Sequence, residues 1–203
     1  MPTRRAVLKG TALSLIGSAL PVSVIAKQAL SAPVKVVYES GIAESVAFRD
    51  ALKHRASGIY ALKQDPAETF RELSGPDHTE TMILGCTKGA AAFVLGELAR
   101  GQGGKMLIFG EHRYLPGAEV QHSLRLHDAG TQMISQAKNW SKAMASALNT
   151  GLFHTVPAKK QVITTTMSRP ANSPDYLITW GILHLNDKAP EKLWDEEVER
   201  RYY

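Results

Sequence analysis

Residues 33–110 alternate between two hydrophobic periods. Short apolar runs rich in β-branched residues predict strands, and the segments between them carry apolar residues at helical spacing. The run at 81–85 is apolar almost throughout, as expected of a strand covered on both faces. Strands that alternate with helices predict a mainly parallel sheet with helices on its faces. The expected strands of this half are 34–38, 59–62, 81–85 and 105–109.

The pattern changes after residue 110. Leu115-Pro116-Gly117-Ala118 has turn chemistry, and residues 120–127 alternate between apolar and polar, which predicts an antiparallel hairpin with the fourth strand. We therefore expect one three-layer α/β domain over residues 33–190, with a mostly parallel central sheet, an antiparallel hairpin extension and helices on both faces. The remaining expected elements are a helix over 133–148, strands over 161–167 and 176–185, and a charged helical tail over 191–203.

Three positions predict the starts of helices. Asp65 can cap a helix whose first residue is Pro66, and Glu68 can reach back to the cap. Ser40 and Thr87 each follow an expected strand, and either hydroxyl can cap the helix that comes next.

The N-terminal 26 residues have the features of an export signal. Residues 3–9, Thr-Arg-Arg-Ala-Val-Leu-Lys, resemble the twin-arginine signal, although Val7 stands where Phe is usual. The apolar stretch over 11–26 is too short and too interrupted for a stable membrane span. Cleavage is expected after Ala26, with Ala32 as a weaker site. The resemblance implies recognition by the twin-arginine translocase, export in the folded state and a periplasmic location.

Composition indicates an ordinary globular domain, with 44% hydrophobic and 21% charged residues. The net charge is +5, but residues 1–26 contain three basic and no acidic residues, so the remainder carries +2. Basic residues outside the signal form only short pairs such as Lys159-Lys160, which disfavours a nucleic-acid partner. The single cysteine, Cys86, excludes an intramolecular disulfide.

The carboxyl ends of the expected parallel strands are the first candidate site, because open α/β sheets usually bind ligands there. This rule selects the strand ends at Glu39-Ser40, Gln64, Cys86-Thr87 and Glu111-His112. Among these residues, Glu39, Ser40 and Thr87 are the candidate ligand-binding residues. Helix N-termini suit anions, so we expect a small carboxylate or phosphate near Ser40 and Thr87. Ordinary helix capping is the alternative role of these two hydroxyls, and no glycine-rich phosphate motif is present.

Cys86 is the first candidate catalytic residue. A thiol at a helix N-terminus can have a lowered pKa and act as a nucleophile, and His112 could serve as its base. Cys86-Thr87 after an apolar strand resembles the aspartate/glutamate racemase arrangement, but those enzymes use two cysteines and this chain has one. The alternative is that Cys86 is a small buried apolar residue.

The expected hairpin supplies a second catalytic candidate. A two-residue turn at Pro116 and Gly117 pairs Glu111 with His122, which could form an acid/base dyad or a surface ion pair. The seven histidines show no close metal-ligand spacing, so no metal site is expected. No motif identifies a cofactor.

Three functions remain open on these residues. The first is a periplasmic protein that binds a small anionic ligand or assists an exported enzyme. The second is a periplasmic hydrolase or transferase that uses Cys86 or the Glu111–His122 pair. The third is an interaction protein whose tail, with Trp194 on one side, docks on a partner.

Overall fold

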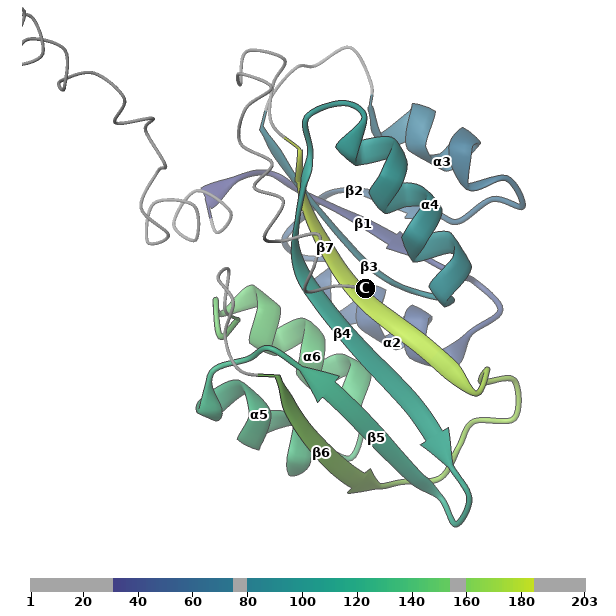
Figure 1. Cartoon of the computed structure of the whole chain (residues 1–203), viewed down its shortest axis with the longest axis vertical. Helices are drawn as coiled ribbons and strands as arrows, with labels where there is room; N and C mark the ends of the chain where they lie inside the picture. The colour runs from purple at the N-terminus through teal and green to yellow at the C-terminus, as the bar shows by residue number, and fades with distance from the viewer. Residues whose placement is uncertain (1–30, 75–79, 154–159, 185–203) are drawn as a thin grey trace, which may run out of the picture.

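The computed structural model describes residues 31–74, 80–153 and 160–184, which form one seven-stranded sheet and five helices (Figure 1). Each strand overlaps a segment that the hydrophobic pattern marks as a strand. The strands are β1 (Val34–Tyr38), β2 (Ala56–Ala61), β3 (Thr81–Thr87), β4 (Lys105–Leu115), β5 (Glu119–Leu124), β6 (Gln161–Thr166) and β7 (Tyr176–His184). The helices are α2 (Ala43–Leu52), α3 (Pro66–Leu73), α4 (Gly89–Arg100), α5 (Asp128–Ser135) and α6 (Trp140–Asn149).

The strand order is β2-β1-β3-β7-β4-β5-β6. Strand β1 pairs in parallel with β2 and β3, whereas the β3–β7, β7–β4, β4–β5 and β5–β6 pairs are antiparallel. The α/β class is therefore confirmed, but the prediction of a mostly parallel sheet is wrong. The sheet is mixed and mostly antiparallel because β7, the last described strand, lies between β3 and β4 (Figure 1).

The antiparallel hairpin of β4 and β5 is confirmed, but its expected register is wrong by one residue. His112 lies opposite His122, and Glu111 lies opposite Ser123. Neighbouring residues of a strand point to opposite faces of the sheet. The expected Glu111–His122 pair is therefore replaced by a pair of histidines on one face.

The length of the connecting loop explains the shift. Leu115 is paired with Glu119, so three residues, Pro116, Gly117 and Ala118, connect the strands in place of the expected two. Gly117 and Ala118 have φ angles of 86° and 62°, in the left-handed region. An added loop residue moves the pairing by one position, as hairpin geometry requires.

Helices pack on both faces of the sheet (Figure 1). Helices α2, α5 and α6 share one hydrophobic cluster with the sheet, and α3 and α4 share a second cluster on the other face. Helices α3 and α4 contact mainly β2, β3, β4 and β7. On the β6 side of the sheet, Val162 is 59% exposed.

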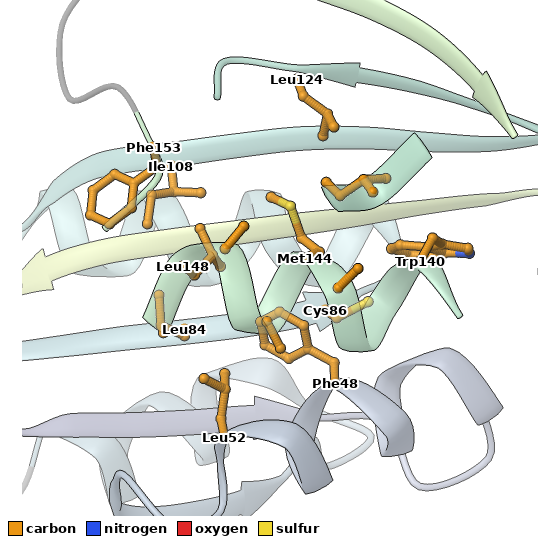
Figure 2. Close-up of a cluster of buried hydrophobic side chains, with 14 of the residues drawn as sticks. Phe48, Leu52, Leu84, Cys86, Ile108, Leu124, Trp140, Met144, Leu148 and Phe153 are labelled. Atoms are coloured by element: carbon orange, nitrogen blue, oxygen red, sulfur yellow. The ribbon is translucent and has the colours of Figure 1, made fainter. Parts of the chain in front are cut away.

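The larger cluster lies between α2, α6 and the sheet. Figure 2 shows Phe48 of α2 and Trp140, Met144 and Leu148 of α6 in this cluster, together with Cys86 of β3. Each of these side chains is at most 1% exposed. Burying one large apolar side chain contributes about 1.5–3 kcal/mol to stability, so this cluster holds the two helices on the sheet.

The helix starts are only partly as expected. Asp65 caps α3 by accepting a 2.9 Å hydrogen bond from the Ala67 N–H, and Pro66 is the first helical residue, which confirms both predictions. The expected caps at Ser40 and Thr87 are wrong. Ile42 precedes α2 and Lys88 precedes α4, and neither makes a side-chain cap hydrogen bond.

The expected single helix over 133–148 is instead divided between α5 and α6. Helix α5 ends at Ser135, and the Asn139 side chain caps α6 by accepting a 3.0 Å hydrogen bond from the Lys142 N–H. Asparagine is a preferred cap residue, and this preference begins a new helix where apolar spacing alone suggests continuity.

The expected export signal over 1–26 and the expected tail helix over 191–203 lie outside the described residues. Within the described ranges, none of the helices is both long enough and apolar enough to cross a membrane.

Candidate functional site

The carboxyl ends of β1, β2 and β3 border an open depression of about 540 Å3, which we call the edge depression. Its walls combine apolar side chains with polar ones from the loops after β1 and β2 and from the start of α4. Glu39, Ser40 and Gln64, all selected from the sequence, lie in its wall. The lining residues are Glu39, Ser40, Gly41, Leu62, Lys63, Gln64, Pro66, Lys88, Ala90, Ala91 and Val94.

The Glu39 carboxylate occupies the N-terminal end of α4. Its Oε1 accepts a 2.7 Å hydrogen bond from the Lys88 N–H, and its Oε2 lies 3.7 Å from the Lys88 Nζ. This contact satisfies one N–H group of the helix start, where the macrodipole favours negative charge. The chain therefore supplies one anion of its own at this helix terminus.

Four exposed side chains of the depression carry hydrogen-bond donors. Ser40 and Gln64 carry neutral donors, while Lys63 and Lys88 carry ammonium groups. Lys63 is shared with two carboxylates of α3, at 2.5 Å from Glu72 and 3.8 Å from Glu68. Lys88 is 60% exposed, and it is the cation best placed to meet a ligand.

Thr87 does not reach the edge depression. Its hydroxyl is buried, where it accepts a 2.9 Å hydrogen bond from Trp180 Nε1 and donates to the Lys88 carbonyl at 3.2 Å. The side chain thus fixes Trp180 of β7 against the end of β3. The structure separates Thr87 from Glu39 and Ser40, the two other residues proposed to bind a ligand.

Cys86 lies on the opposite face of the sheet, in the cluster of Figure 2, and has no exposed surface. Burial raises the pKa of the thiol, and a hydrogen bond with the Thr179 side chain opposes this rise only in part. The nearby carboxylates of Glu44 and Glu39 raise the pKa further. This environment favours the neutral thiol, in contrast to the lowered pKa that a nucleophile at a helix N-terminus would have.

His112 and His122 form the centre of a buried polar cluster between the sheet and α6. Their Nδ1 atoms are 2.8 Å apart, and neither residue has exposed surface. The outer nitrogens are also engaged: His112 Nε2 is 2.7 Å from Thr179 Oγ1, and His122 Nε2 is 2.9 Å from Thr165 Oγ1. We call His112, His122, Thr165, Thr179 and Trp140 the histidine cluster.

Trp140 covers both imidazoles from α6. Its ring stacks on His112 with a centroid distance of 3.9 Å and lies 5.4 Å from the His122 ring. Burial, and then the charge of the neighbouring His122, hold the pKa of His112 well below its usual range. Burial lowers the pKa of His122 from 6.5 to about 4, so both rings are neutral at pH 7.

Glu111 points to the other face of the sheet. Its carboxylate pairs with Lys160 at 2.7 Å and accepts a 3.1 Å hydrogen bond from the Tyr176 hydroxyl. The four expected catalytic residues are thus divided. Thr179 links Cys86 to His112, and His112 contacts His122. The Glu111 carboxylate instead hydrogen-bonds Lys160 and Tyr176 on the other face.

A second buried polar group, around Glu44, was not predicted from the sequence. Glu44 of α2 is 4% exposed, and its Oε1 accepts hydrogen bonds from the hydroxyls of Tyr114 and Ser173. The Tyr114 hydroxyl also lies 3.4 Å from Trp140 Nε1, which joins this group to the histidine cluster. The alternation along β4 places Tyr114 on the face of His112, but nothing local in the sequence indicates that Glu44 is buried.

Among the described residues, no group of three or more His, Cys, Asp or Glu side chains could hold a metal ion. Comparison with protein families, curated proteins and solved structures finds no match to this chain.

Proposed function

We propose that the chain is exported folded by the twin-arginine translocase and binds a small anion in the edge depression. Such a protein could act as a ligand carrier or as an accessory to an exported enzyme. Residues 3–9 support the export route, because they carry the paired arginines that the translocase recognises. The edge depression supports the binding role.

The main support is that donors from three separate segments line one open depression. Ser40 follows β1, Lys63 and Gln64 follow β2, and Lys88 precedes α4. An anion at this position would accept hydrogen bonds from these side chains, and the exposed Lys88 ammonium group would attract it. Apolar walls, such as Val94, would contact the carbon skeleton of an organic carboxylate.

The enzyme alternative has weaker support. Cys86 and His122 are sealed from solvent, and Glu111 lies on the opposite face of the sheet from His122. A catalytic group must come within hydrogen-bond reach of its substrate, and these residues share no opening in the described structure.

Binding can be tested by calorimetry of the full chain with phosphate, sulfate, acetate, succinate and citrate at low ionic strength. We expect at least one of these anions to bind, and Lys88→Gln to weaken that anion about tenfold by removing the most exposed ammonium group. Lys142→Gln is the matched control, because Lys142 is exposed on α6 and outside the depression. The binding proposal is contradicted if none of the five anions binds, or if both lysine variants weaken binding equally.

Export is tested separately by cell fractionation. Replacing both Arg4 and Arg5 by Lys should leave the chain in the cytoplasm, because the translocase reads the arginine pair. Thr3→Ser retains the signal pattern and should be exported normally. Equal export of the two variants would contradict this route.

A further inference from the structure

The histidine cluster has no part in the proposed binding role, yet it places two titratable groups in the centre of the core. His112 of β4 and His122 of β5 are register partners, and Trp140 of the first turn of α6 lies over both rings. All three side chains are at most 1% exposed. Any change in the charge of the imidazoles therefore acts directly on the contact between α6 and the antiparallel half of the sheet.

The 2.8 Å contact between the two Nδ1 atoms allows only certain protonation states. One Nδ1 must carry a proton and the other must accept it. Each outer nitrogen then donates to or accepts from its threonine hydroxyl, which can take either role. One added proton can still be hydrogen-bonded in this arrangement. Two added protons set N–H against N–H and two positive charges side by side, which breaks the contact.

The surroundings provide little compensation for positive charge. Thr165, Thr179 and Trp140 are uncharged, and burial raises the pKa values of Cys86 and Tyr114, so both remain neutral in acid. The charged groups nearest to these residues are Glu44, which hydrogen-bonds Tyr114, and Glu39, whose charge acts with that of Glu44 on Cys86. The Arg169 guanidinium lies 5.3 Å from the centre of the Tyr114 ring, and its charge is paired with Asp175 at 2.7 Å.

Glu44 of α2 is the one buried carboxylate of the described residues. It hydrogen-bonds Tyr114 and Ser173, and neither imidazole has it as a hydrogen-bond partner. Its negative charge therefore does not neutralise a protonated imidazole directly. A protonated pair would remain a buried charge with only uncharged hydrogen-bond partners, which is strongly unfavourable.

We infer that the His112–His122 pair is an acid-sensitive lock between α6 and the antiparallel half of the sheet. The lock is closed while both imidazoles are neutral. Uptake of two protons opens the first turn of α6 and exposes Trp140 and both histidines to water. For an exported protein, this would make the packing of α6 respond to the pH outside the cytoplasm.

The test is tryptophan emission of the full chain between pH 7 and pH 4, with far-UV circular dichroism recorded on the same samples. Trp140→Phe identifies the part of the emission that belongs to Trp140. We expect the Trp140 emission to change between pH 6.5 and 4 while the helical signal is largely retained. The equilibrium constant for opening the first turn of α6 should increase about a hundredfold for each unit by which the pH falls, in the steepest part of the transition, because two protons are taken up.

Two variants test the pair itself. His122→Asn and His112→Asn each leave one titrating ring of the pair. In either variant the equilibrium constant for opening should therefore increase only about tenfold for each unit by which the pH falls. Using both keeps the test valid if one variant fails to fold. His54→Asn removes an exposed histidine of the α2–β2 connection and should behave as the wild type.

Three results would overturn the inference. The first is Trp140 emission that does not change between pH 6.5 and 4. The second is loss of emission and helical signal in one transition, which would indicate global acid unfolding. The third is a stoichiometric metal in the purified protein that both histidine variants lose, because the pair would then hold a metal ion in place of a shared proton.

Discussion

The antiparallel pairing of β3 with β7 can be tested at Gly85, because the Trp180 indole lies across this residue. Gly85 and Trp180 are register partners, and the ring is completely buried. A Cβ atom at position 85 would lie far inside van der Waals contact with the indole carbons, and 2.9 Å from Nε1. The Gly85→Ala variant must therefore displace the ring.

The expected cost has two parts. Displacing a packed ring in a core costs about 1–3 kcal/mol. The displacement also breaks the hydrogen bond from Trp180 Nε1 to Thr87, which contributes about 1 kcal/mol. We expect Gly85→Ala to lower the free energy of unfolding by about 2–4 kcal/mol, measured by urea denaturation.

A double-mutant cycle separates this clash from other effects of alanine. In a Trp180→Leu background the indole is absent, so Gly85→Ala should cost less than about 1 kcal/mol. Gly41→Ala is the control, because no atom lies within 4 Å of its added Cβ and the change should be nearly neutral. Equal costs of Gly85→Ala in both backgrounds would refute the placement of β7 against β3.

Three other measurements test the account. Cys86 should not react with a thiol reagent between pH 6 and 9 until the protein unfolds; rapid reaction of the native protein would contradict its burial. Asp65→Ala should cost about 1 kcal/mol of stability in urea denaturation by removing the cap of α3, whereas Asp65→Asn should retain most of it. The pKa of His122 is lowered in the folded state, so below pH 6.5 the unfolded chain binds a proton more readily than the folded chain does. The folded state therefore loses stability as the pH falls from 6.5 towards 4. The loss in the free energy of unfolding is about 3 kcal/mol, measured by urea denaturation at pH 6.5 and pH 4. An equal loss in the wild type and in His122→Asn would contradict this prediction.

Local patterns predicted most of the elements. The β-branched run at 34–38 is β1, and the Asp65-Pro66 signal marks the start of α3. Both depend on nearby residues, which is the information that periodicity and capping contain. The split between α5 and α6 also has a local cause in Asn139, but apolar spacing over 133–148 obscured it.

The strand order could not be predicted in the same way. Strand β7 follows β6 in the chain but pairs with β3 and β4, and this choice depends on contacts between distant residues. The complementarity of Gly85 and Trp180 is one such contact, and it is visible only when the two strands are adjacent.

The candidate site was predicted where a general rule applied and missed where register mattered. Glu39, Ser40 and Gln64 line the edge depression because β1 and β2 run in parallel and end at one edge. The histidine pair was missed because one extra loop residue, Ala118, moved His122 from Glu111 to His112.

The most direct test of the proposed binding role uses Glu39, the resident anion of the edge depression. Glu39→Gln keeps an oxygen that can accept the Lys88 N–H hydrogen bond but removes a negative charge beside the proposed ligand. For the anion that binds the wild type most tightly, calorimetry at low salt should give a dissociation constant about three to ten times smaller in this variant. An unchanged or larger dissociation constant would contradict anion binding in the edge depression.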